Sequence, residues 1–374
     1  MPDGSLFRAL RSADWQPVLA GKTVRQHALA PRGVTVKAGI SRKQFIAGAA
    51  AAAGLAALTP RPARAARPVV LKFGVDLATD HPTTVGAIAA GKQIETETQG
   101  RVKVQVFPNS ELGNDTNMLS ELRSGAMQMM GIGDNILATL VPSAAIDNVG
   151  FAFKTSQSAW DALDGDVGEL VRADITKAGL HPMHRIWDEG FRQVTSSNKQ
   201  IKTPEDLQGF KIRVPPSPIS VSLFRSLGAA PATLNISELY TALQTHVVDG
   251  QENPLGNIET QKFYQVQKYC SLTNHMWVGY WILVNGTFWA SLPAADQKIV
   301  EDAFNAQALV QRAANEKLDN SLESKLKTEN MEFFQPDQNA FRAALAKSTF
   351  YKDWQAKFGA PLWSALSKYT GPLA

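Results

Sequence analysis

The sequence predicts an α/β protein made of two successive units that face each other across a cleft, with strands crossing between them. Three observations predict this fold class. After residue 66, segments typical of strands and helices alternate in the order β-α-β-α-β, which implies parallel strands with helices on their faces. The alternation restarts near residue 191, and the last third of the chain is mostly helical. A chain of 374 residues also has room for about two domains.

The first unit combines short apolar strands with helices whose ends are marked in the sequence. Strands are expected at residues 69–76, 102–107, 126–133 and 181–187. Helices are expected at residues 82–98, 114–125 and 158–177. Asn114 or Asp115 suits the start of the second of these helices, and Gly125 its end.

The second unit repeats the pattern and leads into the helical third of the chain. Strands are expected at residues 191–197, 210–215, 230–234 and 246–253. Helices are expected at residues 219–227 and 235–244, then at 293–330, and in two shorter segments from residues 337 and 351. Asn235 and Glu238 have the spacing of a capping box, which indicates where the helix at 235–244 begins.

The first 66 residues predict an export signal. Arg42 and Lys43 precede an uncharged run from Phe45 to Leu58, which is too short to span a bilayer comfortably. An "ARA" motif ending at Ala65 then predicts cleavage near residues 65/66. "SRKQFI" is also similar to a twin-arginine signal with lysine as its second basic residue, so the export route stays open. We therefore expect a soluble periplasmic product. The alternative for the run from Phe45 to Leu58 is a buried alanine-rich helix rather than an export signal.

The basic isoelectric point of about 9.0 does not indicate a nucleic-acid partner. Ten of the 38 basic residues and two of the 34 acidic residues lie in positions 1–66. The rest of the chain therefore holds 28 basic and 32 acidic residues, a net charge of −4, and nucleic-acid binding is not expected. The single cysteine, Cys270, excludes a disulfide within the chain and is expected in the core.

Signatures of catalysis and of metal binding are sparse. The chain has no HExxH, GxSxG or GxxxxGK[ST] motif, and "GIGDNI" at residues 131–136 lacks the third glycine of a dinucleotide-binding loop. His181 and His184 are three positions apart on an expected strand, so they point to opposite faces and make poor co-ligands for a metal ion. We expect no catalytic residue, cofactor or metal site.

Three polar side chains stand at the ends of predicted strands: Arg192, Arg213 and Asn253. The planar donor fork of arginine matches a carboxylate, and asparagine adds a donor and an acceptor. Without a nucleophile or base beside them, these residues suit holding an anion rather than transforming it. Arg213 has apolar neighbours in "KIRVP" and is costly to bury without a partner. That partner is either a ligand or an internal carboxylate such as Asp206.

Several stretches resemble the DctP-like extracytoplasmic solute-binding proteins of TRAP transporters. They are "LKFGVD", "FPNSELGND", "GFRQVTSSNKQIKTPEDLQG", "FKIRVPPSP" and the run from "LGAAPATLN" through "VDGQENP" to "QKY". The resemblance covers nearly all of the chain after residue 66. It implies a two-domain periplasmic-binding-protein-like α/β fold with crossing strands and a long C-terminal helix spanning both domains. Domain I would comprise residues 67–191 and about 279–318, and domain II residues 192–278 and about 319–374.

The resemblance also implies a function. Such a protein binds a small organic acid in the interdomain cleft and delivers it to the small and large membrane subunits of the transporter, which import it using a sodium gradient. Arg213 would pair with the ligand carboxylate, with Arg192 as a second arginine and Asn253 in the cleft. Asp76 and Asp115 match positions that often reach the ligand, although Asp115 also suits a helix N-terminus. The alternatives are a sensor that carries ligand to a membrane kinase and an exported enzyme.

The chain departs from the sialic-acid-binding members of that family. Those members carry a glutamate and an arginine after the second helix, where "GIGDNI" has Gly133 and Ile136, so sialic acid is not expected. Asp134 and Asn135 remain polar candidates for ligand contact, with strand-end capping as the alternative.

Aromatic side chains are a further set of candidates: Trp187, Trp277 and Trp281. They could stack on a sugar ring or an aromatic acid, or fill the core. On an alternating strand, Trp277 and Trp281 lie on one face and Tyr280 on the other. A monocarboxylate with a polar body, such as a sugar acid or hydroxy acid, is favoured over C4-dicarboxylates and aromatic acids.

Overall fold

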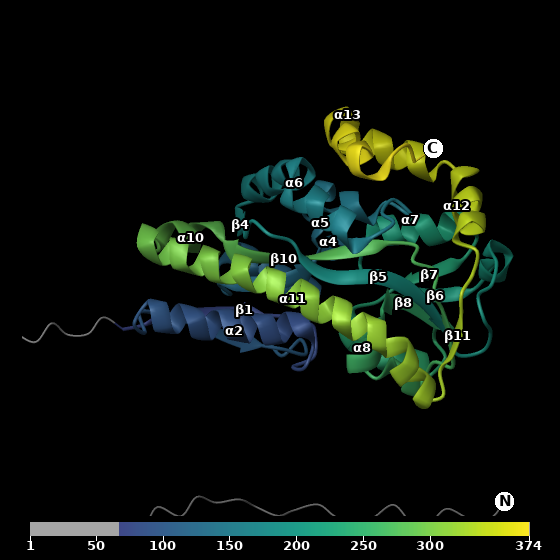
Figure 1. The fold of residues 1–374 in the computed structure, drawn as a ribbon, viewed down its shortest axis with the longest axis horizontal. Coiled ribbons are helices and arrows are strands. Elements are labelled where there is room, and N and C mark those ends of the chain that lie inside the picture. The colour runs from purple at the N-terminus through teal and green to yellow at the C-terminus, as the bar shows by residue number, and fades with distance from the viewer. Residues whose placement is uncertain (1–66, 374) are drawn as a thin grey trace, which may run out of the picture. The chain divides into compact units, whose positions relative to one another are not determined.

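A mixed sheet of eleven strands organises residues 67–373, the part of the chain that the computed structural model describes. The main strand order is β2-β1-β3-β10-β5-β8-β6-β7, and β4, β9 and β11 pair beside it. We call β2, β1, β3 and β10 the first half-sheet, and β8, β6 and β7 the second half-sheet. Strand β5 joins them, which places the two predicted units at opposite ends of one sheet (Figure 1). The predicted export signal lies outside the described residues.

The first half-sheet and its helices come mainly from the chain before residue 183. The elements are β1 (Val69–Gly74), α2 (Pro82–Glu97), β2 (Val102–Phe107), α3 (Asp115–Ser124), β3 (Met129–Gly133), α4 (Asp134–Leu137), η1 (Pro142–Asn148), α5 (Ser156–Asp164), α6 (Asp166–Lys177) and β4 (Leu180–Pro182). Strand β1 pairs in parallel with β2 and β3, as the β-α-β-α-β order predicts.

Two expectations for this part of the chain are wrong in detail. The single helix expected at residues 158–177 is two helices, which meet at Gly165. The backbone there is not helical, and a Cβ at Gly165 would lie 2.7 Å from the carbonyl oxygen of Asp161. The strand expected at residues 181–187 is also divided, because β4 ends at Pro182 and the next strand begins only at Trp187.

The chain that follows forms the joining strand β5 and builds the second half-sheet. Its elements are β5 (Trp187–Ser196), η2 (Pro204–Leu207), β6 (Lys211–Val214), α7 (Pro218–Ser226), β7 (Ala230–Thr233), α8 (Ile236–Gln244), β8 (Gly250–Pro254), α9 (Leu255–Thr260), η3 (Phe263–Gln265) and β9 (Tyr269–Ser271). Strand β6 pairs in parallel with both β7 and β8. The capping box predicted for Asn235 and Glu238 is present at the start of α8.

The rest of the chain returns to the first half-sheet and then spans both halves. Its elements are β10 (Trp277–Asn285), α10 (Gly286–Ser291), α11 (Ala294–Thr328), β11 (Glu332–Phe334), α12 (Gln338–Ala346) and α13 (Phe350–Thr370). Strand β10 pairs antiparallel with β3 and β5, so β5 and β10 are the crossing strands of the prediction. Helix α11 runs beside α2 and past β5 toward α8, as Figure 1 shows.

Helix α11 takes part in two of the three apolar clusters of the core. Val300 and Phe304 pack with β1, α2 and β10, whereas Leu322 and Leu326 pack with α8 and α9. The third cluster lies among α3, α5, α6, α7 and α13. One helix therefore contributes to the core beside each half-sheet, and the long helix spanning both parts of the fold is confirmed. No helix within residues 67–373 is long and apolar enough to cross a membrane.

Candidate functional site

A narrow polar cavity lies where the carboxyl ends of strands from both half-sheets meet. It is lined by Asp76, Asp115, Gly133, Asn135, Ile136, Glu189, Arg192, Arg213, Pro215, Ile236, Asn253, Asn257 and Tyr280. The cavity has a volume of about 20 Å³, which is room for little more than one water molecule. Several of these residues lie at or just after the end of a strand, among them Gly133, Arg213 and Asn253, which is where open α/β sheets bind ligands.

Arg213 is a buried cation without a carboxylate partner among the described residues. Its side chain is 1% exposed, and its one hydrogen bond runs from Nε to the carbonyl oxygen of Leu234, at 2.8 Å. Burial lowers the pKa of the guanidinium to about 10, so Arg213 keeps its charge at neutral pH. The internal alternative is not seen, because Asp206 instead accepts hydrogen bonds from the backbone of Lys202 and Thr203.

Arg192 differs from Arg213 because a glutamate neutralises it. Its Nε and Nη2 both donate to the carboxylate of Glu252, which is fully buried on β8. Nη2 also donates to Asn253 Oδ1, at 3.0 Å. Although burial opposes it, Arg192 holds the pKa of Glu252 below its usual range, with help from His275. The sequence predicts Arg192 at the binding site, and Arg192 does line the cavity. Its pairing with Glu252 has no signal in the sequence.

Two amide side chains, Asn253 on β8 and Asn257 on α9, form hydrogen bonds with the charged residues of the cavity wall. Asn253 donates to Gln251 Oε1 at 2.6 Å, and its Oδ1 faces Arg192. Asn257, one helical turn later, donates to Glu189 Oε1 at 2.7 Å. Burial raises the pKa of Glu189 to about 7, although Arg192 opposes this. Asn253 thus lines the cavity as the sequence predicts, and Asn257 lies beside it.

Asp76, Asp115 and Glu189 bring three buried carboxyl groups to the same cavity. The hydroxyl of Tyr280 donates to Asp76 Oδ1. Burial raises the pKa of Asp76, and burial together with Asp76 raises the pKa of Asp115 well above its usual value. Both carboxyl oxygens of Asp115 are buried without a hydrogen-bond partner among the described residues. Asn114, not Asp115, caps α3, so the capping role weighed for Asp115 is taken by its neighbour.

Of the two polar candidates after β3, Asn135 lines the cavity and Asp134 does not. Asp134 Oδ1 accepts from the backbone of Asn135 at 2.6 Å and from Asn148 Nδ2 at 2.8 Å, while Oδ2 accepts from the backbone of Gly279 at 2.5 Å. These contacts fit the capping alternative. The expectation that Asp134 faces a ligand is therefore corrected: its oxygens hold the start of α4 and strand β10.

The three tryptophan candidates lie in the core and not on the cavity wall, which corrects the expectation that they stack on a ligand. Trp187 packs against Phe304, with ring centroids 6.2 Å apart. Trp277 and Trp281 belong to the cluster of α5, α7 and α13. The predicted alternation along β10 is confirmed, because Tyr280 points to the other side and reaches the cavity. The positions of all three tryptophans fit the alternative of core packing.

Sequence reasoning missed Glu189, Asn257 and Tyr280 as members of this site. Two signals were available. Glu189 is a charged residue within "WDEGF", a segment with apolar ends that the sequence predicts to cross between units. Asn257 follows Asn253 by four residues, which is the spacing of one helical turn. Glu189 precedes Arg192 by three residues, and their side chains lie 3.7 Å apart.

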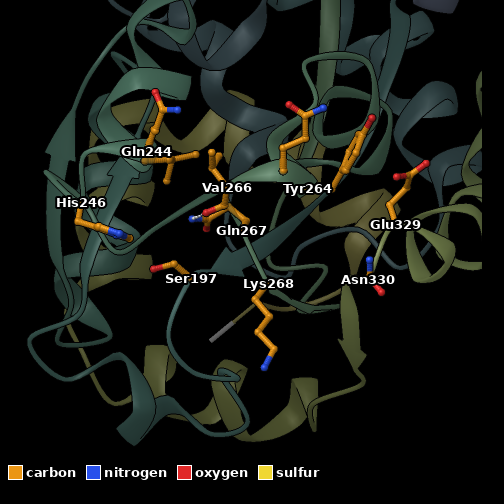
Figure 2. A pocket seen from close by; sticks show the side chains of 11 residues that line it. Ser197, Gln244, His246, Tyr264, Val266, Gln267, Lys268, Glu329 and Asn330 are labelled. Atoms are coloured by element: carbon orange, nitrogen blue, oxygen red, sulfur yellow. Dashed lines mark hydrogen bonds between the residues drawn. The ribbon is translucent and has the colours of Figure 1, made fainter.

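A larger hollow on the second half of the molecule lacks the buried charged residues that line this cavity. It has a volume of about 710 Å³ and is bounded by the end of α8, by η3 with the residues that follow it, and by the residues just after α11. Figure 2 shows Lys268, Tyr264 and Glu329 around it, pointing in different directions rather than toward one centre. Most of its polar residues are exposed, and no buried charge faces it. Within residues 67–373, no group of histidine, cysteine or acidic side chains is placed to hold a metal ion.

The model of one protein family matches most of the chain. Residues 73–355 match the family described as bacterial extracellular solute-binding protein, family 7. Among similar sequences, a 2,3-diketo-L-gulonate-binding periplasmic protein of Escherichia coli is 34% identical over 63% of this chain and 72% of its own length. An uncharacterised Sinorhizobium fredii protein is 38% identical over 66% of this chain, which spans 45% of that protein.

Solved structures share the fold over most of the described residues. A sugar acid binding protein from Advenella mimigardefordensis in complex with galactonate is 28% identical, with a TM-score of 0.78, over 82% of this chain and 99% of that chain. A TRAP periplasmic solute binding protein from Sulfurospirillum deleyianum with bound succinate is 29% identical, with a TM-score of 0.76, over 81% and 98%. These similarities cover both half-sheets and thus the cavity between them.

Proposed function

Because this chain belongs to the bacterial extracellular solute-binding proteins of family 7, we propose that it is the periplasmic receptor of a TRAP transporter, which captures a small organic acid and delivers it to the membrane permease. The family and the solved structures are binding proteins, so the prediction that the chain is not an enzyme is confirmed. The small and large membrane subunits, the export and the periplasmic location are parts of the proposal.

The observation that carries the proposal is the unpaired charge of Arg213. A buried guanidinium without a carboxylate leaves most of its donors to be satisfied by something that enters the cavity. A carboxylate fits this fork in charge and geometry. Arg192 is less available, because Glu252 already accepts from two of its nitrogens. We therefore assign the ligand carboxylate to Arg213, with Asn253 and Arg192 as its neighbours.

The geometry also supports a cycle of opening and closing. The cavity is narrow, and its walls come from both half-sheets, so a ligand larger than a few water molecules enters only if the walls move apart. A ligand that contacts both walls then stabilises the closed arrangement by its differential affinity for that state. The domain boundaries expected from the sequence, near residues 191 and 278, place the moving parts on either side of β5 and β10 and remain part of the proposal.

Arg213→Met tests this proposal, because methionine has a similar length and no charge. Wild-type protein, denatured and refolded to remove any bound cargo, is screened by thermal shift against uronates, aldonates, hydroxy acids, C4-dicarboxylates and aromatic acids. Ligand at a thousand times its dissociation constant adds about 4 kcal/mol to the free energy of unfolding. We expect a shift of several degrees for one carboxylate class. In Arg213→Met this binding should weaken by about 2–5 kcal/mol.

The control is Arg225→Met, which removes an exposed arginine from α7 in the same half of the fold. It should bind like the wild type. Arg213→Met should also fold normally, since the substitution removes a buried charge that lacks an ionic partner. Wild-type affinity of Arg213→Met for the same carboxylate would show that Arg213 is not the anchor and would defeat the proposal.

A further inference from the structure

One side of the cavity carries a cation and an amide, and the other side carries carboxyl groups. Arg213 and Asn253 come from the second half-sheet, whereas Asp76 and Asp115 come from the first. Glu189, on the strand between them, adds a third carboxyl group. We call Asp76, Asp115 and Glu189 the acidic wall. A ligand whose carboxylate lies on Arg213 therefore presents the rest of its body to hydrogen-bond acceptors.

Asp115 is the member of the acidic wall that the protein itself leaves unsatisfied. The residue is 1% exposed, and neither of its carboxyl oxygens has a hydrogen-bond partner among the described residues. In contrast, Asp76 accepts from Tyr280 and Glu189 accepts from Asn257. Buried polar atoms in folded proteins nearly always have partners, so an orphaned carboxyl group facing a cavity indicates that a ligand supplies one.

The acidic wall discriminates between the two ligand types bound by the similar solved structures. A second carboxylate, as in succinate, brings negative charge and only acceptors against Asp115 and Glu189. A hydroxyl group brings a donor for each carboxyl oxygen and also an acceptor for a protonated carboxyl group. Burial and mutual repulsion raise the pKa of Asp115 and Glu189, so a hydroxyl group has the advantage that it suits a carboxyl group in either protonation state, whereas a second carboxylate is repelled by each carboxyl group that is ionised. Because the raised pKa lowers their average charge, these acids also attract a ligand ammonium group less than fully ionised carboxylates would.

On the basis of the proposed function, we infer that the cargo is a polyhydroxy monocarboxylate, with its carboxylate on Arg213 and its hydroxyl groups on the acidic wall, and that Asp115 selects it against dicarboxylates. The same arrangement explains closure, because such a ligand satisfies a cation on one half-sheet and carboxyl groups on the other. The position of Asp115 at the start of α3, next to the cap residue Asn114, fixes its carboxyl group in the cavity without a structural duty as the cap.

Four ligands of equal chain length test the inference by isothermal titration: D-erythronate, succinate, 4-aminobutyrate and butyrate. D-galactonate extends the hydroxylated series. The wild type should bind at least one of the two aldonates about tenfold or more tightly than the other three, because like-charge apposition costs several kcal/mol and 1.4 kcal/mol is tenfold. A preference for succinate or 4-aminobutyrate over both aldonates overturns the inference and leaves the proposed receptor function intact. Absence of binding by every carboxylate overturns both.

Asp115→Asn assigns the selectivity to this residue. The amide has nearly the same shape but lacks the negative charge, so the ratio of the succinate to the aldonate dissociation constant should fall by about tenfold. Asp302→Asn, at an exposed position on α11, should leave the ratio unchanged. A ratio that is unaltered in both Asp115→Asn and Asp115→Ala overturns the role of Asp115. Thermal melting of each ligand-free variant shows that it is folded, so loss of folding is not mistaken for loss of selectivity.

Discussion

Two buried arginines, Arg192 on β5 and Arg213 on β6, show how one residue type can have two different roles. Arg192 is held by Glu252, which also contacts His275 Nε2 at 3.2 Å. Burial lowers the pKa of His275, and a neutral imidazole that donates from Nε2 and accepts from Thr273 at Nδ1 fits both of its contacts. Arg213 has no carboxylate partner of this kind among the described residues. The structure thus separates a positioning ion pair from a cation that is free to meet a ligand.

Glu252→Gln should destabilise the fold strongly, because it leaves the buried charge of Arg192 uncompensated. Removing one partner of a buried ion pair costs about 3–5 kcal/mol. Urea denaturation at pH 7 measures the loss as a change in the free energy of unfolding. Glu323→Gln is the control, since Glu323 pairs with Lys327 on the exposed face of α11 and should cost less than about 1 kcal/mol. Equal small losses in both variants would contradict the role of Glu252.

The effect of Glu252→Gln should also depend on pH in a defined direction. The folded pKa of Glu252 lies below its ordinary value of 4.5. A depressed carboxyl pKa contributes stability that is present above the unfolded value and is lost as the pH falls through the folded value. The gap between the wild type and the variant should therefore be widest at neutral pH and shrink in acid.

At the scale of elements, β5 is where the fold changes from one half-sheet to the other. Gly190 lies at the crossing with a φ of +104°, a conformation that residues with a side chain rarely adopt. Opposite it, β10 shifts register between Val278 and Gly279. A Cβ at Gly190 would lie 3.1 Å from Asp319 Oδ2 on α11. The crossing is thus an irregular point of the sheet that depends on a glycine, which suits the proposed hinge.

Two acids of this crossing region make stability depend on pH. Burial raises the pKa of Asp319 to about 8, with a further increase from Asp188, whose own pKa is about 7. An acid with a raised folded pKa loses stability as the pH rises from its unfolded value, 3.8, through its folded value. Asp319→Asn should therefore stabilise the protein by roughly 1–3 kcal/mol at pH 9 and hardly at all at pH 4.

Urea denaturation at pH 4 and pH 9 distinguishes an effect of the Asp319 charge from a change in stability that does not depend on pH. Asp319 is only half-buried as a residue, although its Oδ1 is enclosed without a partner among the described residues, which is why a modest gain is expected. Asp302→Asn on the same helix serves as the matched control and should change stability little at either pH. A gain of the same size at pH 4 and pH 9 would mean that the charge of Asp319 is not its cause.

At the scale of the whole molecule, the two halves also meet through contacts away from the cavity lining, and the proposed closed state depends on them. Gln261, after α9, reaches the carbonyl oxygen of Asp76 at 3.4 Å. Gly256 on α9 approaches His81, the cap of α2, so closely that a Cβ would lie 3.3 Å from His81 Nε2. Helix α11 packs with α2 at one end and with α9 toward the other. These contacts set how tightly the halves approach.

Gly256→Val should weaken ligand binding without removing any polar group from the cavity. Its methyl groups would press α9 away from His81, and a smaller population of the closed state raises the apparent dissociation constant in proportion. We expect about a tenfold weaker affinity by titration, which corresponds to 1.4 kcal/mol. Gly256→Ala is the graded comparison, since a lone Cβ needs only a slight adjustment and should cost less. Unchanged affinity in Gly256→Val would show that closure does not require this approach.

The sequence by itself determined most of the elements, their order and the side of the sheet where polar residues gather. Helix caps, glycine stops and apolar periodicity are local signals, so the strands around Arg213 and Asn253 and the helix at Ala294–Thr328 were predictable from short stretches. The resemblance of "RVP" and "VDGQENP" to a family then indicated which of these polar residues meet in one place.

Only the tertiary structure decided which side chains face the cavity and which are neutralised elsewhere. Asp134 and Asn135 are neighbours, yet one holds backbone amides and the other lines the site. The pairing of Arg192 with Glu252 joins residues 60 positions apart on antiparallel strands. The physical reason is that periodicity gives the face of a strand or helix, whereas the partner on that face depends on the register and packing of distant segments.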